Sequence, residues 1–513
     1  MTAVPGRRWF ATPAALPLLA ALAVSLPLLL DVEADPDLWW HIRTGEMILE
    51  LGGLPDADPF SFTAAGAPWT NHEWGSDVLL AAAYRVGGGR ALVLLRALLF
   101  AGAMALLARL VWDRFPHPLG LVALLLGAAE TASGFLNLRP HTFTYLLTLG
   151  FLAAADAHRR GGRRALWAWP ALMVLWVNLH GGFVLGLAVA ACAAVALLLR
   201  RGAGAGERKR VLLAGGLTAL APLVNPYGAG LFAYLARELG ADHSLVLEWV
   251  GIARVPAAAG TFLAFTLLPL AGLVIAGLVR GRGRRFEQVA LWAIAVAATW
   301  VHARFLVLLV LAGTLVLASS LGALWPRLTA GGRRRLVAAL ERPRWAAAVC
   351  LAVALFGAVR VARDLAEHRL RLPIDTTHYP VLAVEFLKAH DLGPNLALRL
   401  DWGGYAIWHL WPGYRVSADG RNLTVYGAEE IDAQLRAYDR GTWGELFAGR
   451  ADAVLIESGG PAFEGLLADG GWVPVYRDPL AAVLVPPAVA AELGARRQRP
   501  ERPEPRDDWA YFP

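Results

Sequence analysis

A dense group of ionisable and aromatic side chains follows the first apolar run of this sequence. The run covers residues 11–30, and the seven residues from Asp35 to His41 then read Asp-Pro-Asp-Leu-Trp-Trp-His. Carboxylates beside a membrane can ligate a divalent cation or accept a proton from an attacking hydroxyl or amide. Ionisable groups at such positions are rare unless they are used, so this stretch is the first candidate site. Asp37 is the stronger candidate, because Asp35 could simply cap the helix that begins near residue 37.

A second acidic point lies in the same loop, in the sequence Asn71-His72-Glu73-Trp74. A histidine beside a glutamate could complete a metal shell or position an acceptor. The His-Glu-x-x-His spacing of zinc proteases is absent, so that chemistry is not supported. A divalent metal such as Mg²⁺ or Mn²⁺ could be held by Asp37, Asp35 and His72, but an ordinary loop pair explains His72 and Glu73 equally well.

Two isolated arginines, Arg139 and Arg304, stand at predicted span ends in loops that are otherwise poor in positive charge. A guanidinium at headgroup level can pair bidentately with a phosphate. It can also extend to lipid headgroups without any specific role. For Arg304 we favour the phosphate of a bound lipid, because its loop is too short to need charge for another reason.

The composition is that of a helical membrane protein. Of 513 residues, 57% are hydrophobic and 17% charged, with a mean hydropathy of +0.47. Soluble chains carry about 25% charged residues, and a span needs about 20 apolar ones. Clustered loop arginines explain the net charge of +7, so nucleic-acid binding is not expected, and no Walker loop or dinucleotide fingerprint occurs. About eleven spans are predicted: residues 11–30, 90–112, 118–135, 142–157, 165–177, 182–199, 211–224, 261–279, 286–300, 305–325 and 345–362.

The loops between these spans alternate in charge and predict the topology. Arginine-rich segments at residues 159–164, 200–210, 280–285 and 327–344 alternate with loops that hold single arginines and several acidic residues. Because positive loops stay on the cytoplasmic side, the N-terminus is predicted to be cytoplasmic and the C-terminal third periplasmic. The location that fits best is a bacterial inner membrane.

The first outer loop, residues 31–77, is too long for a simple connection. Residues 37–51 read as an amphipathic helix and residues 77–86 as a second short helix before the next span. Helices with one apolar face beside a membrane tend to lie along it. We therefore expect a transmembrane domain over residues 1–362 that includes this loop.

Beyond residue 362 the pattern becomes that of a soluble α/β domain, with a disordered tail over residues 496–513. Helices are predicted at residues 380–390, 429–438 and 461–468, and a mixed segment at 405–411. Strands are predicted at 395–400, 414–418 and 453–457, followed by a strand pair at 472–477 and 481–485. The predicted fold class is thus mainly α, a polytopic helical membrane protein with a small extracytoplasmic α/β domain at residues 363–495.

This plan resembles the GT-C superfamily of glycosyltransferases, which take sugars from polyprenyl-phosphate or polyprenyl-pyrophosphate lipids. The closest local similarity is to the oligosaccharyltransferase catalytic subunit, whose first loop carries an Asp, an aromatic pair, an Arg and a later Gly. Here Asp37, the Trp39–Trp40 pair, Arg43 and Gly52 are similar. That family's Trp-Trp-Asp-Tyr-Gly motif is echoed by Leu400-Asp401-Trp402-Gly403-Gly404-Tyr405, which lacks the double tryptophan.

The resemblance implies roles for individual residues. Asp37 would be the base or metal-bound carboxylate of an inverting displacement at the anomeric carbon, and Glu73 the second carboxylate. Arg304 and Arg139 would hold the departing lipid phosphate, which needs electrostatic help. The acceptor would be bound by Asp401, Trp402 and Tyr405.

Two other functions remain open on the sequence alone. A transporter or flippase of lipid-linked glycans needs polar groups in mid-span, for which Glu130 is the one clear candidate. A non-catalytic membrane scaffold would tolerate alanine at the outer acidic residues. The first hypothesis is a transferase acting on an unknown glycan, lipid or protein acceptor of the cell envelope.

Overall fold

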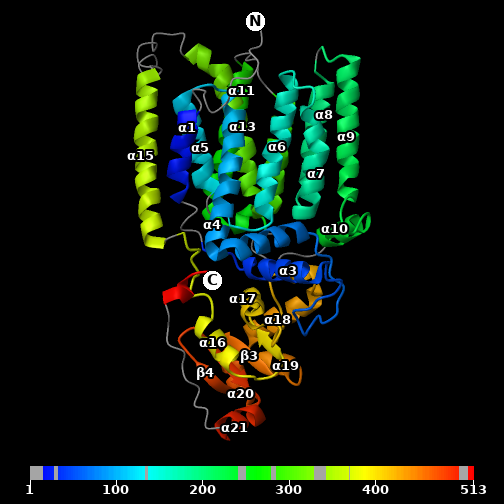
Figure 1. Ribbon diagram of the computed structural model, residues 1–513, viewed down its shortest axis with the longest axis vertical. Helices are drawn as coiled ribbons and strands as arrows, with labels where there is room; N and C mark the ends of the chain where they lie inside the picture. The colour runs from blue at the N-terminus through cyan, green and yellow to red at the C-terminus, as the bar shows by residue number, and fades with distance from the viewer. Residues whose placement is uncertain are drawn as a thin grey trace. The chain divides into compact units, whose positions relative to one another are not determined.

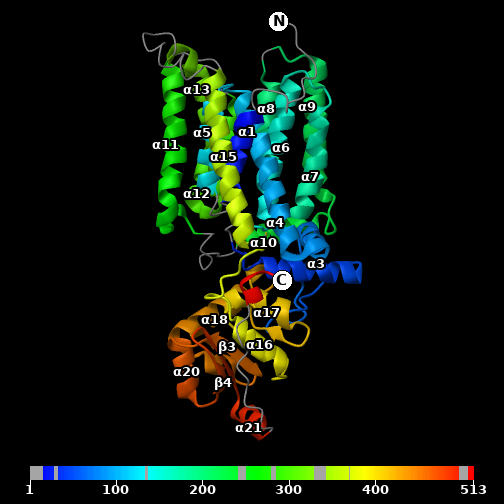
Figure 2. The ribbon, with the colours of Figure 1, turned by 60° about the vertical axis from the view of Figure 1, so that its left-hand side comes forward.

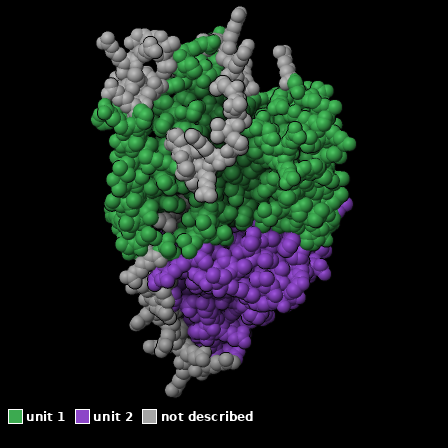
Figure 3. All heavy atoms as spheres, turned by 45° about the horizontal axis from the view of Figure 1, so that its top comes forward, with its two compact units in different colours: residues 1–32, 93–228, 243–370 green, residues 33–92, 229–242, 371–513 purple. Residues whose placement is uncertain are grey.

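A computed structural model describes residues 15–27, 33–132, 137–200, 202–240, 250–278, 285–328, 343–368, 370–495 and 507–513. The chain forms two compact units, coloured in Figure 3. Unit 1 comprises residues 1–32, 93–228 and 243–370, and unit 2 comprises residues 33–92, 229–242 and 371–513. Unit 2 thus combines the first outer loop with the C-terminal third of the chain.

Unit 1 is a bundle of apolar helices that run side by side (Figures 1 and 2). All eleven predicted spans coincide with helices. These are α1 (Ala15–Ser25), the second part of α4 (Trp74–Trp112), α5 (Pro118–Ala132), α6 (His141–Arg159), α7 (Ala168–Leu179), α8 (Phe183–Leu198), α9 (Ala205–Leu220), α11 (Pro256–Leu278), α12 (Phe286–Val301), α13 (Leu306–Leu328) and α15 (Pro343–His368).

Four described helices are long and apolar enough to cross a membrane. These four segments are Trp74–Trp112, Pro256–Leu278, Ala303–Arg327 and Pro343–Glu367. Five more apolar helices are 10–17 residues long. The number of crossings, about eleven from the sequence, stays a prediction.

Helix α4 belongs to both units and is broken where two glycines meet. Gly88 has a φ of 57°, in the left-handed region that favours glycine, and Gly87 has φ −161° and ψ 25°. The sequence predicts a short helix at residues 77–86 and a span from residue 90. The break at Gly87 and Gly88 is where those two predicted elements separate.

Unit 1 buries a network of charges around Asp156, near the end of α6. Its carboxylate pairs with Arg114 at 3.0 Å, with Arg159 at 3.1 Å and with Arg285. Arg159 also binds Glu287 of α12 at 2.7 Å. The network ties the end of α6 to the start of α12 and to the turn after α4.

Unit 2 contains a five-stranded sheet in the order β2-β1-β3-β5-β4. The strands are β1 (Asn395–Leu398), β2 (Arg415–Val416), β3 (Ala453–Glu457), β4 (Val473–Arg477) and β5 (Ala481–Val485). β1 pairs in parallel with β2 and β3, whereas β5 pairs antiparallel with β3 and β4. The predicted strand pair at residues 472–485 is present.

Short helices surround this sheet. They are α16 (Val381–Ala389), α17 (Gly403–Leu410), α18 (Ala428–Arg440), α19 (Trp443–Phe447), α20 (Pro461–Asp469) and α21 (Pro487–Ala495). Trp443, Phe447, Phe463 and Leu466 fill the core between helices and strands. The segment predicted as mixed, residues 405–411, is mostly the helix α17.

The first outer loop adds to the edge of this sheet within unit 2. Val416 of β2 donates its N–H to the Phe60 carbonyl at 2.9 Å, and Phe62 donates to the Val416 carbonyl at 3.0 Å. Helix α3 (Leu38–Leu51), the predicted amphipathic helix, packs on α17. The loop is therefore held by the C-terminal α/β fold rather than by its own residues alone.

The end of the chain also packs in unit 2. The sequence predicts disorder from residue 496, and residues 496–506 lie outside the described part of the chain. Phe512, in contrast, is buried and stacks on Trp39 with 4.1 Å between ring centroids. The stacking of Phe512 on Trp39 therefore packs the end of the chain into the core of unit 2.

Candidate active site

Asp37 stands at the N-terminal cap of α3, and several groups fix its position. Its backbone N–H donates to Oδ1 of buried Asp35 at 2.9 Å. Its own Oδ1 accepts a hydrogen bond from the Trp40 indole N–H at 3.1 Å. Asp35 therefore orders the turn ahead of the helix, whose N-cap residue is Asp37 rather than Asp35. Asp37 is the half-buried carboxylate of the pair.

His41 lies one turn further along α3 and is bound to a buried carboxylate. Its Nδ1 is 2.6 Å from Oδ1 of Asp77, in the first turns of α4, and Asn71 donates to the other Asp77 oxygen at 2.7 Å. The Trp40 ring stacks on the imidazole with 3.6 Å between centroids. Asp77 thus holds the imidazole in one orientation, in the way a carboxylate holds a catalytic histidine.

Glu73 faces two histidines. Its Oε2 is 3.9 Å from Nε2 of His41, and its Oε1 is 3.6 Å from Nε2 of His72. The Glu73 side chain is 17% exposed, whereas that of His41 is only 2% exposed. Glu73 is consequently the part of this group that a substrate could contact, with His41 and Asp77 behind it.

Together these contacts place the two predicted carboxylates in one continuous group. Asp37 contacts Trp40, Trp40 stacks on His41, and His41 faces Glu73. Asp37 at the N-cap of α3 lies three residues before Trp40 and four before His41, so the three side chains share one side of the helix. We call Asp37, Trp40, His41, Glu73 and Asp77 the first-loop cluster.

A metal site can be tested against the described residues. Among them, no group of three or more His, Cys, Asp and Glu side chains is arranged to hold a metal ion. The predicted set of Asp37, Asp35 and His72 therefore does not form such a group. Mg²⁺ often uses only one or two carboxylates with substrate phosphates, so a metal requirement stays a prediction, and no step below depends on a metal.

A fully buried ion cluster lies next to the first-loop cluster. Arg421 donates from Nη1 to Asp58 at 2.6 Å, from Nη2 to Asp419 at 2.7 Å and from Nε to Asp419 at 2.8 Å. All three side chains are 0% exposed. The guanidinium also lies over the rings of Phe60 and Trp69, at 5.0 and 4.8 Å.

The opposite charges in this cluster stabilise the ionised forms of Asp419 and Arg421. Burial alone would raise the pKa of Asp419, but the Arg421 guanidinium and the Tyr426 hydroxyl hold it below its ordinary value. Burial would lower the pKa of Arg421, but Asp419 and Asp58 raise it well above its ordinary value. We call Asp58, Asp419, Arg421 and Tyr426 the buried-arginine cluster; it joins the first loop to the turn after β2.

The residues predicted to bind the acceptor differ in exposure. Asp401 is 41% exposed and pairs with Arg399 at 2.7 Å. Trp402 is buried and donates its indole N–H to the His378 carbonyl at 2.7 Å. Tyr405 is buried against Trp39, with ring centroids 4.9 Å apart. Only Asp401 of the three therefore presents its side chain to solvent in unit 2.

The two predicted phosphate-binding arginines belong to unit 1. Arg304 lies in the short 3-10 helix η7 (Ala303–Phe305), and the neighbouring Ala303 N–H donates to the Val250 carbonyl at 2.9 Å. Arg139 precedes α6, whose Thr144 hydroxyl meets His180 at 2.8 Å. Both arginines are half-buried, and their phosphate-binding role stays a prediction.

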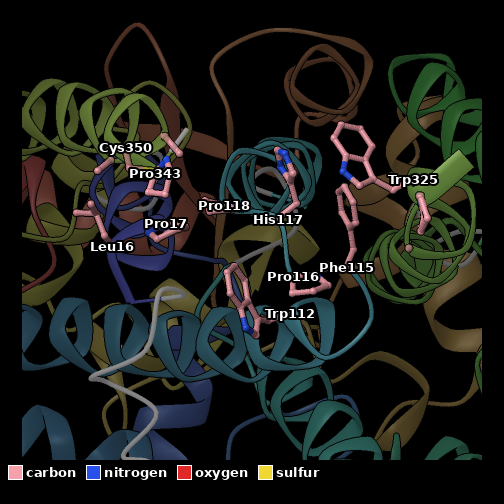
Figure 4. Close-up of a pocket in the computed structure, with 14 residues that line it drawn as sticks. Leu16, Pro17, Trp112, Phe115, Pro116, His117, Pro118, Trp325, Pro343 and Cys350 are labelled. Atoms are coloured by element: carbon pink, nitrogen blue, oxygen red, sulfur yellow. The ribbon is translucent and has the colours of Figure 1, made fainter. Parts of the chain in front are cut away.

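Unit 1 also contains an apolar pocket of about 820 Å³ (Figure 4). It is formed by the ends of α1, α4, α13 and α15, and Trp112, Phe115, His117 and Trp325 are among its lining residues. None of the predicted site residues lines it. We do not assign it to the candidate active site.

Comparison with solved structures gives the fold a context. The oligosaccharyltransferase AglB from Archaeoglobus fulgidus, in complex with an inhibitory peptide and a dolichol-phosphate, has a TM-score of 0.55 at 15% identity, over 88% of this chain and 70% of that chain. The apo form gives a TM-score of 0.56 at 12% identity over the same shares. Arabinofuranosyltransferase AftD from mycobacteria gives 0.54 at 17% identity, over 94% of this chain and 42% of that one.

The chain has the fold of the GT-C superfamily. No family model and no curated protein matches the sequence. Four of the described helices are, by length and composition, able to cross a membrane. At these identities the GT-C likeness establishes the fold, and substrate and donor must be argued from the site.

Several residues of the site were not predicted from the sequence. His41 appears in the sequence only as part of the first polar stretch, and its partner Asp77 only at the start of a predicted helix. The sequence assigns no role to Asp58, Asp419 or Arg421. Arg96, 2% exposed within α4 of unit 1, is a further buried charge that the predicted span 90–112 contained.

Proposed function

We propose that this chain is an integral membrane glycosyltransferase that moves a sugar from a polyprenyl-phosphate or polyprenyl-pyrophosphate donor to an acceptor of the cell envelope. The observation that carries the proposal is the first-loop cluster, in which Asp37 and Glu73 are joined through Trp40 and His41. The GT-C fold supports it, because AglB, which shares the fold, has been solved with a dolichol-phosphate bound.

The chemistry proposed is a single inverting displacement. A nucleophilic O–H or N–H of the acceptor attacks the anomeric carbon while the bond from that carbon to the phosphate oxygen breaks. The electron pair of that bond leaves with the phosphate, and the proton of the nucleophile passes to the Asp37 carboxylate. Glu73, with His41 and Asp77 behind it, provides negative charge where the sugar ring becomes positive.

The remaining roles follow from exposure and charge. Arg304 and Arg139 would neutralise the departing lipid phosphate. Asp401, the exposed member of its motif, would contact the acceptor, while buried Trp402 and Tyr405 would hold the segment in place. The N-terminus would be cytoplasmic and residues 363–495 periplasmic, in the inner membrane of a bacterium.

A transfer assay with a matched pair of variants tests the proposal. The purified protein in nanodiscs is incubated with radiolabelled short-chain polyprenyl-phosphate monosaccharides and an envelope extract as acceptor. Asp37→Asn should lower the transfer rate by about 10²-fold or more, because a general base contributes that much. Asp56→Asn, a change at an exposed carboxylate of the same loop, should leave it unchanged. Equal rates for Asp37→Asn and the unaltered protein would remove the catalytic role.

Transport of a lipid-linked glycan is the second candidate, and one observation favours it. Arg96 is buried within a helix long enough to span a membrane, where a charged side chain suggests a route or a site. Glu130, which the sequence offered for such a route, is instead exposed and lies two residues before the end of α5. Movement of labelled lipid across proteoliposomes without release of its phosphate would favour transport.

A further inference from the structure

Two glycines of the C-terminal third lie against the turn that carries Asp37. A Cβ added at Gly420 would stand 1.9 Å from Oδ1 of Asp37 and 3.1 Å from Nε1 of Trp40. A Cβ added at Gly404, in α17, would stand 2.7 Å from the Pro36 carbonyl oxygen. Real Cβ atoms do not come closer than about 3.0 Å to such atoms. Any side chain at Gly420 would therefore have to displace the carboxylate.

The turn that carries Gly420 cannot easily retreat. Asp419 and Arg421, on either side of it, are both fully buried, and Arg421 binds both Asp419 and Asp58. The Arg421 backbone N–H also donates to Oδ1 of Asp419 at 2.9 Å. Moving the turn would break charge-assisted bonds inside the protein, where they are strongest.

Helix α17 also packs against the turn that carries Gly420. A Cβ added at Gly403 would stand 2.1 Å from the Ala418 carbonyl oxygen and 2.6 Å from Cα of Asp419. Backbone therefore packs directly on backbone where α17 meets residues 418–419. The two glycines of the acceptor-like motif thus bring its backbone against residues 418–419 and against the Pro36 carbonyl.

We propose that Gly403, Gly404 and Gly420, held by the buried-arginine cluster, form a seat that fixes the Asp37 carboxylate for catalysis. These are positioning residues, because they act through Asp37. The part of this inference that concerns catalysis rests on the proposed function, whereas the seat itself is a statement about packing.

A double-mutant cycle tests the seat without any substrate. Thermal unfolding midpoints are measured in nanodiscs for Gly420→Ala, Asp37→Ala, the double variant Asp37→Ala/Gly420→Ala, and the control Gly459→Ala, whose added Cβ would meet nothing within 4 Å. Gly420→Ala should lower the midpoint by about 3 °C or more, and by less than half as much once Asp37 is alanine, because the clashing oxygen is gone. The control should leave the midpoint unchanged. Equal losses in both backgrounds, or no loss, would overturn the seat.

Transfer kinetics test its catalytic consequence. Gly420→Ala should lower kcat at least tenfold, and KM for the labelled donor should change less than kcat, because the donor-binding groups are intact; Gly459→Ala should match the unaltered protein. If the unaltered protein transfers sugar and Gly420→Ala transfers it as fast, the positioning role is wrong. If no protein transfers sugar while the cycle shows coupling, the proposed function fails and the seat stands.

A variant that fails to fold is also informative. If Gly420→Ala does not accumulate but Asp37→Ala/Gly420→Ala does, the rescue supports the seat directly. If both are lost, Gly404→Ala, with its milder approach of 2.7 Å to a carbonyl oxygen, takes the place of Gly420→Ala in the kinetic comparison. Unchanged kcat in Gly404→Ala would then overturn the proposal.

Discussion

In unit 2, the Arg421 guanidinium is fully enclosed and donates to two carboxylates, Asp58 and Asp419, while in unit 1 a single carboxylate, Asp156, is surrounded by three arginines. The unit 1 arginines reach solvent in part, since Arg159 and Arg285 are 17% and 26% exposed. Nε of Arg114 and Oε2 of Glu287 are buried without a hydrogen bond among the described residues.

The contrast indicates two uses of buried charge. A network with excess arginines and unsatisfied atoms suits the anchoring of helix ends, where positive charge fixes topology. A cluster whose guanidinium bonds two carboxylates, bordering Asp37 through Gly420, suits the fixing of one side chain. Mutations in the two clusters should therefore differ in what they damage.

The largest effect is expected at Arg421. Arg421→Met removes the charge while keeping the length of the side chain, and it leaves Asp58 and Asp419 buried without a cation. Breaking a buried pair in this way costs about 3–5 kcal/mol. Thermal unfolding in nanodiscs measures the loss, and a cost below about 1 kcal/mol would show that the cluster contributes no more than a surface ion pair.

A smaller and purely structural effect is expected at Asp156. Asp156→Asn leaves three arginines facing one another, two of which can reach water, so the cost should be about 1–3 kcal/mol. The transfer rate per folded molecule should not change, because the network consists of unit 1 residues and includes no residue of the first-loop cluster. A tenfold fall in that rate would remove the distinction between the two clusters.

The variant His41→Gln tests whether a buried polar group of unit 2 contributes to kcat. The amide can still accept or donate toward Asp77, but it cannot carry a proton next to Glu73. The expected fall in kcat is about 10- to 100-fold, with little change in the unfolding midpoint. A kcat equal to that of the unaltered protein would show that His41 only fills space.

The smallest effect is a pH dependence confined to unit 2. Burial and the nearby Lys388 ammonium lower the pKa of His409 to about 3. The unfolded chain takes up this proton near pH 6.5 and the folded one does not, so stability falls as the pH drops from about 6.5 toward 3. The expected loss between pH 7 and pH 5.5 is about 1 kcal/mol. His409→Gln should remove it, and an equal acid dependence in that variant would assign the loss to other groups.

Much of the fold could be predicted because long apolar runs that are bounded by arginine and glycine predict helices. Each of the eleven predicted spans overlaps a helix, and the predicted amphipathic helix at residues 37–51 is α3. Helix α17 was missed because its Gly403-Gly404 start has low helix propensity. These glycines are present for close packing on residue 418 and the Pro36 carbonyl, which local sequence does not reveal.

The site was predictable only where a residue stands in a conspicuous polar stretch of the first loop. Asp37 and Glu73 stand in polar stretches of one loop, and the structure joins them through His41. The bond from Arg421 to Asp58 crosses 363 positions of the sequence, and the His41–Asp77 contact crosses 36. Such pairs depend on how α3, α4 and β2 pack, so residue type and spacing gave no indication of the partner.

The central claim is that sugar leaves its lipid at Asp37. The most direct test is a single-turnover reaction in nanodiscs with doubly labelled polyprenyl-phosphate sugar, counting free lipid phosphate and sugar on the acceptor in the same sample. We predict equal amounts of the two products with the unaltered protein, and neither product with Asp37→Asn. Undiminished, matched formation of both products by Asp37→Asn, or loss of labelled lipid without free phosphate in the unaltered protein, would contradict the account.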